Sequence, residues 1–154
     1  MGNKGKDMTN PVDRRVVHAF YEAWASRDAA KIAPFLDDDV EWMIVGPVDL
    51  FQFCGPRHGK AAVIDLFQNV IPSVMLVERC TNDIVLIDGD RAASLNRLTG
   101  EQAANGRTIS YRTAHFMRFR NNKVVEFRSI IDSFDAAEQM LGHPIELVPE
   151  LAPA

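Results

Sequence analysis

The sequence is poor in cysteine, with only Cys54 and Cys80 among its 154 residues. Two thiols are too few for a disulfide framework, and no His, Cys and Asp cluster at metal-ligand spacing supplements them. We therefore expect reduced thiols, no metal site and no cofactor. This cysteine usage is typical of a cytoplasmic protein.

Long apolar runs and an excess of positive charge are also missing. No apolar stretch approaches the about 20 residues that span a bilayer. The start, MGNKGKDMTN, lacks the apolar segment of a signal peptide. With 17 basic and 21 acidic residues, the net charge of −4 argues against binding to phosphate backbones. We predict a protein that binds neither a membrane nor nucleic acid.

The composition that remains is globular, with 47% apolar and 25% charged residues in a chain long enough for one core. We expect a mobile tail at residues 1–10, a single domain at 11–143 and a C-terminal tail at 144–154. Neither a Gly-x-Ser-x-Gly motif nor a glycine-rich phosphate loop is present, so neither chemistry is supported.

Helical patterns come first along the chain. Asn10-Pro11 predicts a helix start, and helical spacing continues to Arg27. Asp28 caps a short second helix, and a third runs from residue 60 until Pro72 ends it. Apolar runs separated by the turn signals TND, DGD, AANG and NN then predict strands. This order predicts an α+β fold: a cone-shaped α+β barrel, with a strongly curved antiparallel sheet wrapped around the N-terminal helices.

The strand SYRTAHFMRF separates into two faces under its period of two. Arginines occupy one face, so the other should point inward; its members are Tyr111, Thr113, His115, Met117 and Phe119. A three-residue loop at 120–122 would place His115 opposite Phe127, with Phe127 and Ser129 inside and Asp132 outside. On the strand LNRLTGE, either Asn96 or Arg97 faces inward, because the two faces have similar compositions.

Three segments, in this order, carry a family resemblance: FYEAWASRDAAKIAPFLDDDVEW, GPRHGKAAVIDLF and HFMRFRNNKVVEFRSIID, with QMLG after them. The chain resembles the SnoaL-like and ketosteroid-isomerase-like branch of the nuclear transport factor 2-like superfamily. That resemblance implies a conical pocket and frequent dimerisation through the outer sheet face. Its members include isomerases, cyclases, dehydratases, epoxide hydrolases and non-catalytic binding modules.

The resemblance also allows each family chemistry to be compared with this sequence. The tyrosine and base positions of ketosteroid isomerases fall on Phe20 and Trp42, which suit neither role, while a remaining donor position falls on His115. The Arg-x-Asp pair of limonene-type epoxide hydrolases is interrupted after Arg97, and their last-strand aspartate falls on Ser129. The acid/base aspartate of SnoaL-like cyclases falls on Asp132, which a bulge would turn inward; the alternative role is a helix cap.

We therefore predict His115 and Asp132 as candidate catalytic residues. The candidate ligand-binding residues are Trp42, Tyr111, Thr113, Met117, Arg97, Phe20, Phe53, Phe127 and Ser129. The expected function is cofactor-independent isomerisation, cyclisation or dehydration of a small apolar molecule. A binding module or an accessory subunit of a larger enzyme is the alternative, and His115 and Trp42 have ordinary core roles as their alternatives.

Two further expectations concern surfaces. Leu50, Phe51 and Phe53 lie in a loop at 46–58 and are too apolar for solvent, which predicts that this loop closes the pocket mouth. The outer sheet face mixes Phe116 with arginines and Glu126, which suits a self-complementary interface and predicts a homodimer.

Overall fold

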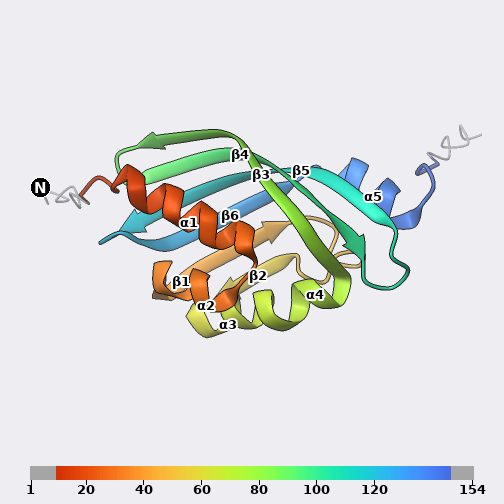
Figure 1. Cartoon of the computed structure of the whole chain (residues 1–154), viewed down its shortest axis with the longest axis horizontal. Helices are drawn as coiled ribbons and strands as arrows, with labels where there is room; N and C mark the ends of the chain where they lie inside the picture. Colours follow the sequence, from red (N-terminus) through yellow and green to blue (C-terminus); the bar gives the residue numbers. More distant parts are fainter. Residues whose placement is uncertain (1–9, 147–154) are drawn as a thin grey trace, which may run out of the picture.

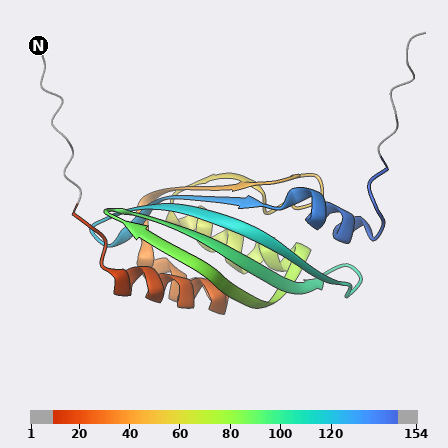
Figure 2. The same cartoon turned by 90° about the horizontal axis from the view of Figure 1, so that it is seen from above.

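A computed structural model describes residues 10–146 of the chain, so most of both expected tails lies outside the described residues. Figure 1 shows a long curved sheet with helices α1 to α4 against one side of it and α5 at the far end. Seen from above in Figure 2, the long strands curve together, with α1 along one side. The sheet does not close on itself, because β2 and β3 are its two edges. The α+β cone expected from the sequence is confirmed.

Helix α1 (Arg14–Ser26) begins three residues later than the Asn10-Pro11 signal predicted. Its cap is Asp13, whose carboxylate accepts a hydrogen bond of 2.8 Å from the Arg15 backbone N–H. The helix buries one stripe, formed by Val17, Phe20, Tyr21, Ala23 and Trp24. The next two short elements, α2 (Ala29–Ile32) and η1 (Ala33–Phe35), lead the chain into the sheet.

The third helical segment is longer than expected and is interrupted by a π-helical turn. Helix α3 (Lys60–Asp65) continues through η2 (Leu66–Val70) into α4 (Ile71–Val74). The prediction that Pro72 ends this helix is wrong, because the proline lies in the first turn of α4, where its missing N–H is tolerated. The π-helical turn carries Phe67, one of the side chains that line the candidate site.

The six strands are ordered β2-β1-β6-β5-β4-β3. Their bounds are β1 Leu36–Val45, β2 Gly55–His58, β3 Met75–Asp88, β4 Arg91–Gln102, β5 Thr108–Arg120 and β6 Lys123–Ile131. The expectation of a wholly antiparallel sheet is wrong for one pair, since β1 and β6 run parallel. The expected turn at TND lies within β3, where register shifts absorb it without ending the strand.

The hairpin between β5 and β6 differs from the predicted three-residue loop. Arg120 pairs with Lys123, so the turn contains only Asn121 and Asn122, both with positive φ. A bulge next to the turn adds one residue to β6 and restores the predicted inward face. As a result His115 lies opposite Ser129, two residues beyond the predicted partner.

Helix α5 (Ser133–Leu141) packs against β5 after the last strand. Gln139 links the two, because its side chain donates to the Ser110 carbonyl and accepts from the Ser110 N–H. No helix among the described residues is long and apolar enough to cross a membrane.

Close packing of β3 against β4 predicts that Gly100→Ala destabilises the fold. An added Cβ would collide with the Leu76 carbonyl oxygen and lie 2.9 Å from the Val77 Cα. We expect a loss of about 2 kcal/mol in the free energy of unfolding, measured by urea denaturation. Gly106→Asn is the control, since no atom lies within 4 Å of a Cβ there and asparagine tolerates its positive φ. Equal stability of wild type and Gly100→Ala would contradict the steric reading.

Candidate functional site

A belt of polar side chains crosses the inner face of the sheet. Strand pairing aligns Ser94 of β4 with His115 of β5, and His115 with Ser129 of β6. Two residues further along β4, Asn96 lies opposite Thr113 of β5. All five side chains are buried, which is uncommon for polar groups unless they are hydrogen-bonded.

Four members of this polar belt bond to one another or to neighbours. The Thr113 and Ser129 hydroxyls lie 2.6 Å apart. The Asn96 amide donates to the Ser94 hydroxyl over 2.9 Å and to the Thr113 carbonyl over 3.2 Å. Tyr21 on α1 shares a short hydrogen bond with Ser94, which ties the helix to the belt. These bonds offset the desolvation of the four groups.

His115 is the member left unsatisfied, because its buried Nδ1 has no hydrogen-bond partner. Aromatic rings surround it: Tyr21 is stacked at 6.0 Å, Trp24 meets it edge-on at 4.8 Å and Phe127 lies at 4.7 Å. Burial lowers the pKa of His115 from 6.5 to about 3, and the positive charge of Arg27 adds to this effect. The imidazole is therefore neutral at pH 7.

Trp42 provides a second unsatisfied polar atom. Its ring stacks on Phe127 at 3.7 Å and meets Phe67 edge-on at 5.9 Å. The indole Nε1 is buried and donates to no described residue. An unpaired buried donor of this kind costs about 1–3 kcal/mol.

Arg27 brings a positive charge close to Trp42 and His115. It was not among the residues predicted from the sequence. It ends α1 with φ 59, in the left-handed region. Its guanidinium carbon lies 5.2 Å from the Trp24 ring centre and 4.7 Å from that of Phe67. Burial lowers the pKa of Arg27, although the group stays charged. The sequence signal was an arginine where a helix usually ends with glycine or asparagine.

These groups surround one small cavity of about 40 Å³. Its lining residues are Trp24, Arg27, Trp42, Ile44, Phe53, Phe67, Ile71, Met75, Val77, Leu98, Tyr111, Thr113, His115, Phe127, Ser129 and Ile131. None of these is Asp or Glu. The space holds at most a few waters, whereas a cavity that accepts benzene measures about 150 Å³. Side chains must therefore move before a ring can enter.

Tyr111 brings a third hydroxyl to this cavity, beside those of Thr113 and Ser129. Its side chain is buried, and burial raises its pKa while Arg27 opposes the rise. The hydroxyl is therefore protonated at neutral pH and can donate a hydrogen bond. Tyr111 also packs beside Phe51, whose ring centre lies 6.1 Å away.

Seven of the candidate residues line the cavity together: Trp42, Phe53, Tyr111, Thr113, His115, Phe127 and Ser129. Phe20 and Met117 are buried in the surrounding core but outside this lining. Phe20 instead packs against Tyr21, Phe35 and Phe127.

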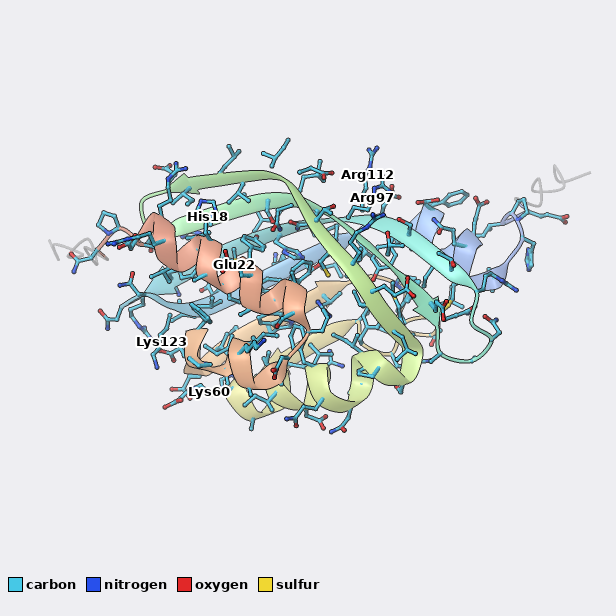
Figure 3. The ribbon with its side chains drawn as sticks, viewed as in Figure 1. His18, Glu22, Lys60, Arg97, Arg112 and Lys123 are labelled. Atoms are coloured by element: carbon cyan, nitrogen blue, oxygen red, sulfur yellow. The ribbon has the colours of Figure 1, made fainter. Side chains whose placement is uncertain are left out.

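Two candidates lie elsewhere. Asn96 faces inward with no exposed surface, so an inward Arg97 is wrong; Arg97 pairs with Arg112 across the opposite face, and Figure 3 labels both. Asp132 is exposed and does not line the cavity, so its assignment as a pocket acid is wrong. It occupies the N-cap position of α5, but its side chain makes no capping hydrogen bond.

The segment predicted as a loop at 46–58 contains strand β2 at Gly55–His58, and its apolar residues Leu50, Phe51 and Phe53 precede that strand. Phe51 and Phe53 are buried and lie 5.3 Å apart, while Leu50 is half-buried against the core. Phe53 lines the same cavity as His115. Among the described residues no group of three His, Cys, Asp or Glu side chains is arranged to hold a metal ion.

The lowered pKa of His115 predicts how stability depends on pH. The unfolded chain binds the proton below pH 6.5, whereas the folded chain resists it down to about pH 3. The contribution of neutral His115 to the free energy of unfolding is therefore complete above pH 6.5. It falls on acidification by up to about 1.4 kcal/mol per pH unit.

Because glutamine does not titrate, the stability difference between wild type and His115→Gln should shrink by about 2 kcal/mol between pH 7 and about pH 5. Urea denaturation at both pH values measures it, and His18→Gln, at an exposed site on α1, is the control. A difference that stays constant with pH would show that His115 is not held neutral by burial.

Comparison with known proteins agrees with this architecture. The SnoaL-like domain model matches residues 17–127. A putative isomerase from Rhodopseudomonas palustris is 35% identical, over 84% of this chain and 95% of that one, with a TM-score of 0.71. A nuclear transport factor 2-like protein of unknown function from Burkholderia pseudomallei is 26% identical, over 82% and 93%, with a TM-score of 0.71.

An LEH-like epoxide hydrolase from M. tuberculosis shares the fold at 16% identity, over 83% of this chain and 88% of that one, with a TM-score of 0.66. No curated protein matches the chain. The match of the domain model to most of the chain, together with the 35% identical structure, decides the family. This chain belongs to the SnoaL-like family of ketosteroid-isomerase-like, nuclear transport factor 2-like proteins.

Proposed function

We propose that the chain binds a small, flat and largely apolar molecule in the cone, through an oxygen function on that molecule. The observation that carries the proposal is the pair of unpaired polar atoms in an aromatic cavity, His115 Nδ1 and Trp42 Nε1. A buried polar group without a partner costs about 1–3 kcal/mol. A ligand oxygen that accepts from the Trp42 N–H, or from His115 in its Nδ1–H tautomer, recovers that energy on binding.

The lining explains why the ligand should be flat. Trp24, Trp42, Phe53, Phe67 and Phe127 present ring faces or edges to the cavity. Such surfaces favour another planar ring, through burial of apolar area and offset stacking. Since the empty space is only about 40 Å³, entry requires displacement of the segment at 46–54 or of the side chain of Arg27.

Cofactor-independent catalysis is the second candidate function, favoured by the convergence of donors on one space. Trp42 N–H, Tyr111 O–H and Arg27 can together stabilise negative charge on a carbonyl oxygen as an enolate forms. Neutral His115 is the lining group suited to carry the proton between carbon positions, since no carboxylate lines the cavity. Isomerisation, cyclisation and dehydration all fit this scheme, and the Rhodopseudomonas palustris relative is a putative isomerase.

The low pKa of His115 favours binding of a ligand without its chemical conversion. A base whose pKa is about 3 accepts a proton poorly at pH 7. A role as the small subunit of a larger enzyme needs no ligand in the cone at all. Both cysteines are free, which suits the cytoplasmic location that we propose.

Replacement of His115 separates these roles. In the catalytic scheme His115→Gln should abolish turnover of a carbonyl substrate, while ligand affinity changes less than about tenfold because glutamine keeps hydrogen bonding. Mass spectrometry of compounds extracted from the denatured protein supplies the candidate ligands, and calorimetry measures their affinity. His18→Gln, on the exposed side of α1 in Figure 3, is the control. Full turnover by His115→Gln would remove His115 from catalysis, and no affinity for any aromatic ligand would contradict the binding proposal.

We also propose a homodimer formed through the outer sheet face. A hollow of about 810 Å³ lies on this face, and Phe116 and Ile130 expose 52% and 44% of their surface there. Arg118 and Glu126 form a 2.7 Å ion pair beside them, which supplies polar groups for a self-complementary rim.

Phe116→Glu should therefore convert a dimer to a monomer, because it places repelling charges near the centre of the contact. Light scattering at micromolar concentration measures the mass. Phe134→Glu, at a phenylalanine of α5 that is 55% exposed, should leave the dimer intact. A monomeric wild type would contradict the proposal.

A further inference from the structure

We propose that the ligand carries a planar anion, a carboxylate, which Arg27 binds at the end of α1. The inference rests on the proposed binding function and extends it by naming the charged group. Binding to oxygen donors alone does not require it, because a neutral ketone would satisfy His115 and Trp42. The anion is supported by the positive charge of Arg27 at the cavity, which no Asp or Glu of the described residues matches.

The first observation is that Arg27 has no acidic partner. Among the described residues, no Asp or Glu oxygen lies within the 4.0 Å of its guanidinium that defines an ion pair. The guanidinium donates a long hydrogen bond of 3.4 Å to the Trp24 carbonyl. The Cys80 thiol also hydrogen-bonds to it, and Tyr111 interacts with it electrostatically. Burial raises the pKa of both groups, so neither carries a compensating charge at pH 7.

The second observation is where the guanidinium is held. The guanidinium carbon lies 5.2 Å from the centre of the Trp24 ring and 4.7 Å from that of Phe67, and both residues line the cavity. A guanidinium carries five N–H donors, so contacts with the Trp24 carbonyl and the Cys80 thiol leave others for a ligand. Two such N–H groups of a planar guanidinium match the two oxygens of a carboxylate, with which they form paired hydrogen bonds.

The third observation is the character of the remaining lining. Besides Arg27, the lining residues with polar side-chain groups are Trp24, Trp42, the neutral His115, Tyr111, Thr113 and Ser129, with no Asp or Glu among them. Donors and a cation without an acid produce a positive potential in a space of low dielectric. The field of Arg27 reaches His115, whose pKa it lowers further. An anion is the ligand that this field attracts.

The backbone at Arg27 is consistent with selection for the side chain. Its φ of 59 is a conformation that glycine or asparagine adopts more easily than arginine. The sequence therefore places a long cationic side chain where local structure alone favours a small one. Together with the aromatic lining, this points to an aromatic carboxylate as the ligand class.

The test compares acids with their neutral amides. Calorimetry measures the dissociation constants of benzoate, benzamide, 2-naphthoate and 2-naphthamide for four proteins: wild type, Arg27→Gln, Arg27→Lys and Arg14→Gln. Arg14 is an exposed arginine at the start of the same helix, so Arg14→Gln removes the same charge away from the cavity. Arg27→Asn is the substitute if Arg27→Gln does not fold, because asparagine suits the positive φ. Thermal melts establish that each variant is folded.

We expect wild type and Arg14→Gln to bind each acid at least about tenfold more tightly than its amide, as for a partly buried, charge-assisted pair. Arg27→Gln should lose this preference, and Arg27→Lys should recover part of it because it keeps the charge without the planar fork. Equal affinity of wild type for acid and amide would overturn the carboxylate inference and leave the binding proposal standing. If folded Arg27→Gln still prefers the acids, Arg27 is not the group that binds the carboxylate, and the inference is wrong. No binding of either class would overturn the binding proposal, and the inference with it.

Discussion

The site depends on one constraint: polar side chains buried inside an aromatic cone must find hydrogen-bond partners. Ser94, Asn96, Thr113 and Ser129 meet this constraint among themselves, with backbone carbonyls of β5 and β6, and with Tyr21 and Asn82. The register of β4, β5 and β6 makes this possible by placing the side chains opposite one another. His115 lies in the middle of the same row and does not meet the constraint. His115 is therefore packed by the rings of Tyr21, Trp24 and Phe127, and its Nδ1 is left without a partner among the described residues.

The remaining groups at the cavity determine the kind of ligand that we propose. Trp42 contributes an unpaired N–H, and Arg27 contributes a positive charge that no described acid balances. Burial keeps His115 neutral, and the charge of Arg27 strengthens this effect. A site of this composition stabilises negative charge on oxygen, which serves both an anionic ligand and an enolate intermediate. It lacks the carboxylate base that ketosteroid isomerases use, in agreement with the presence of Trp42 at that position.

The sequence predicted most of the inner face, because alternation along β5 separates arginines from the buried set that includes Tyr111 and His115. It could not fix the register of β5 and β6, since a two-residue turn with a bulge and a three-residue loop produce the same inward face. The choice between Asn96 and Arg97 was equally open, because hydrogen bonds from other strands decide which polar side chain is buried. Arg27 was missed because its role arises from the meeting of α1 with the π-helical turn at Phe67, which no local pattern encodes.

The most direct test of the account is a crystal structure of the protein with 6-bromo-2-naphthoate bound. The anomalous signal of bromine locates the ring independently of any assumption about the site. The account predicts that bromine lies in the cone among Trp42, Phe53 and Phe127, with a carboxylate oxygen within about 3 Å of the Arg27 guanidinium. Bromine on the outer sheet face, or a bound ring whose carboxylate points away from Arg27, would contradict it.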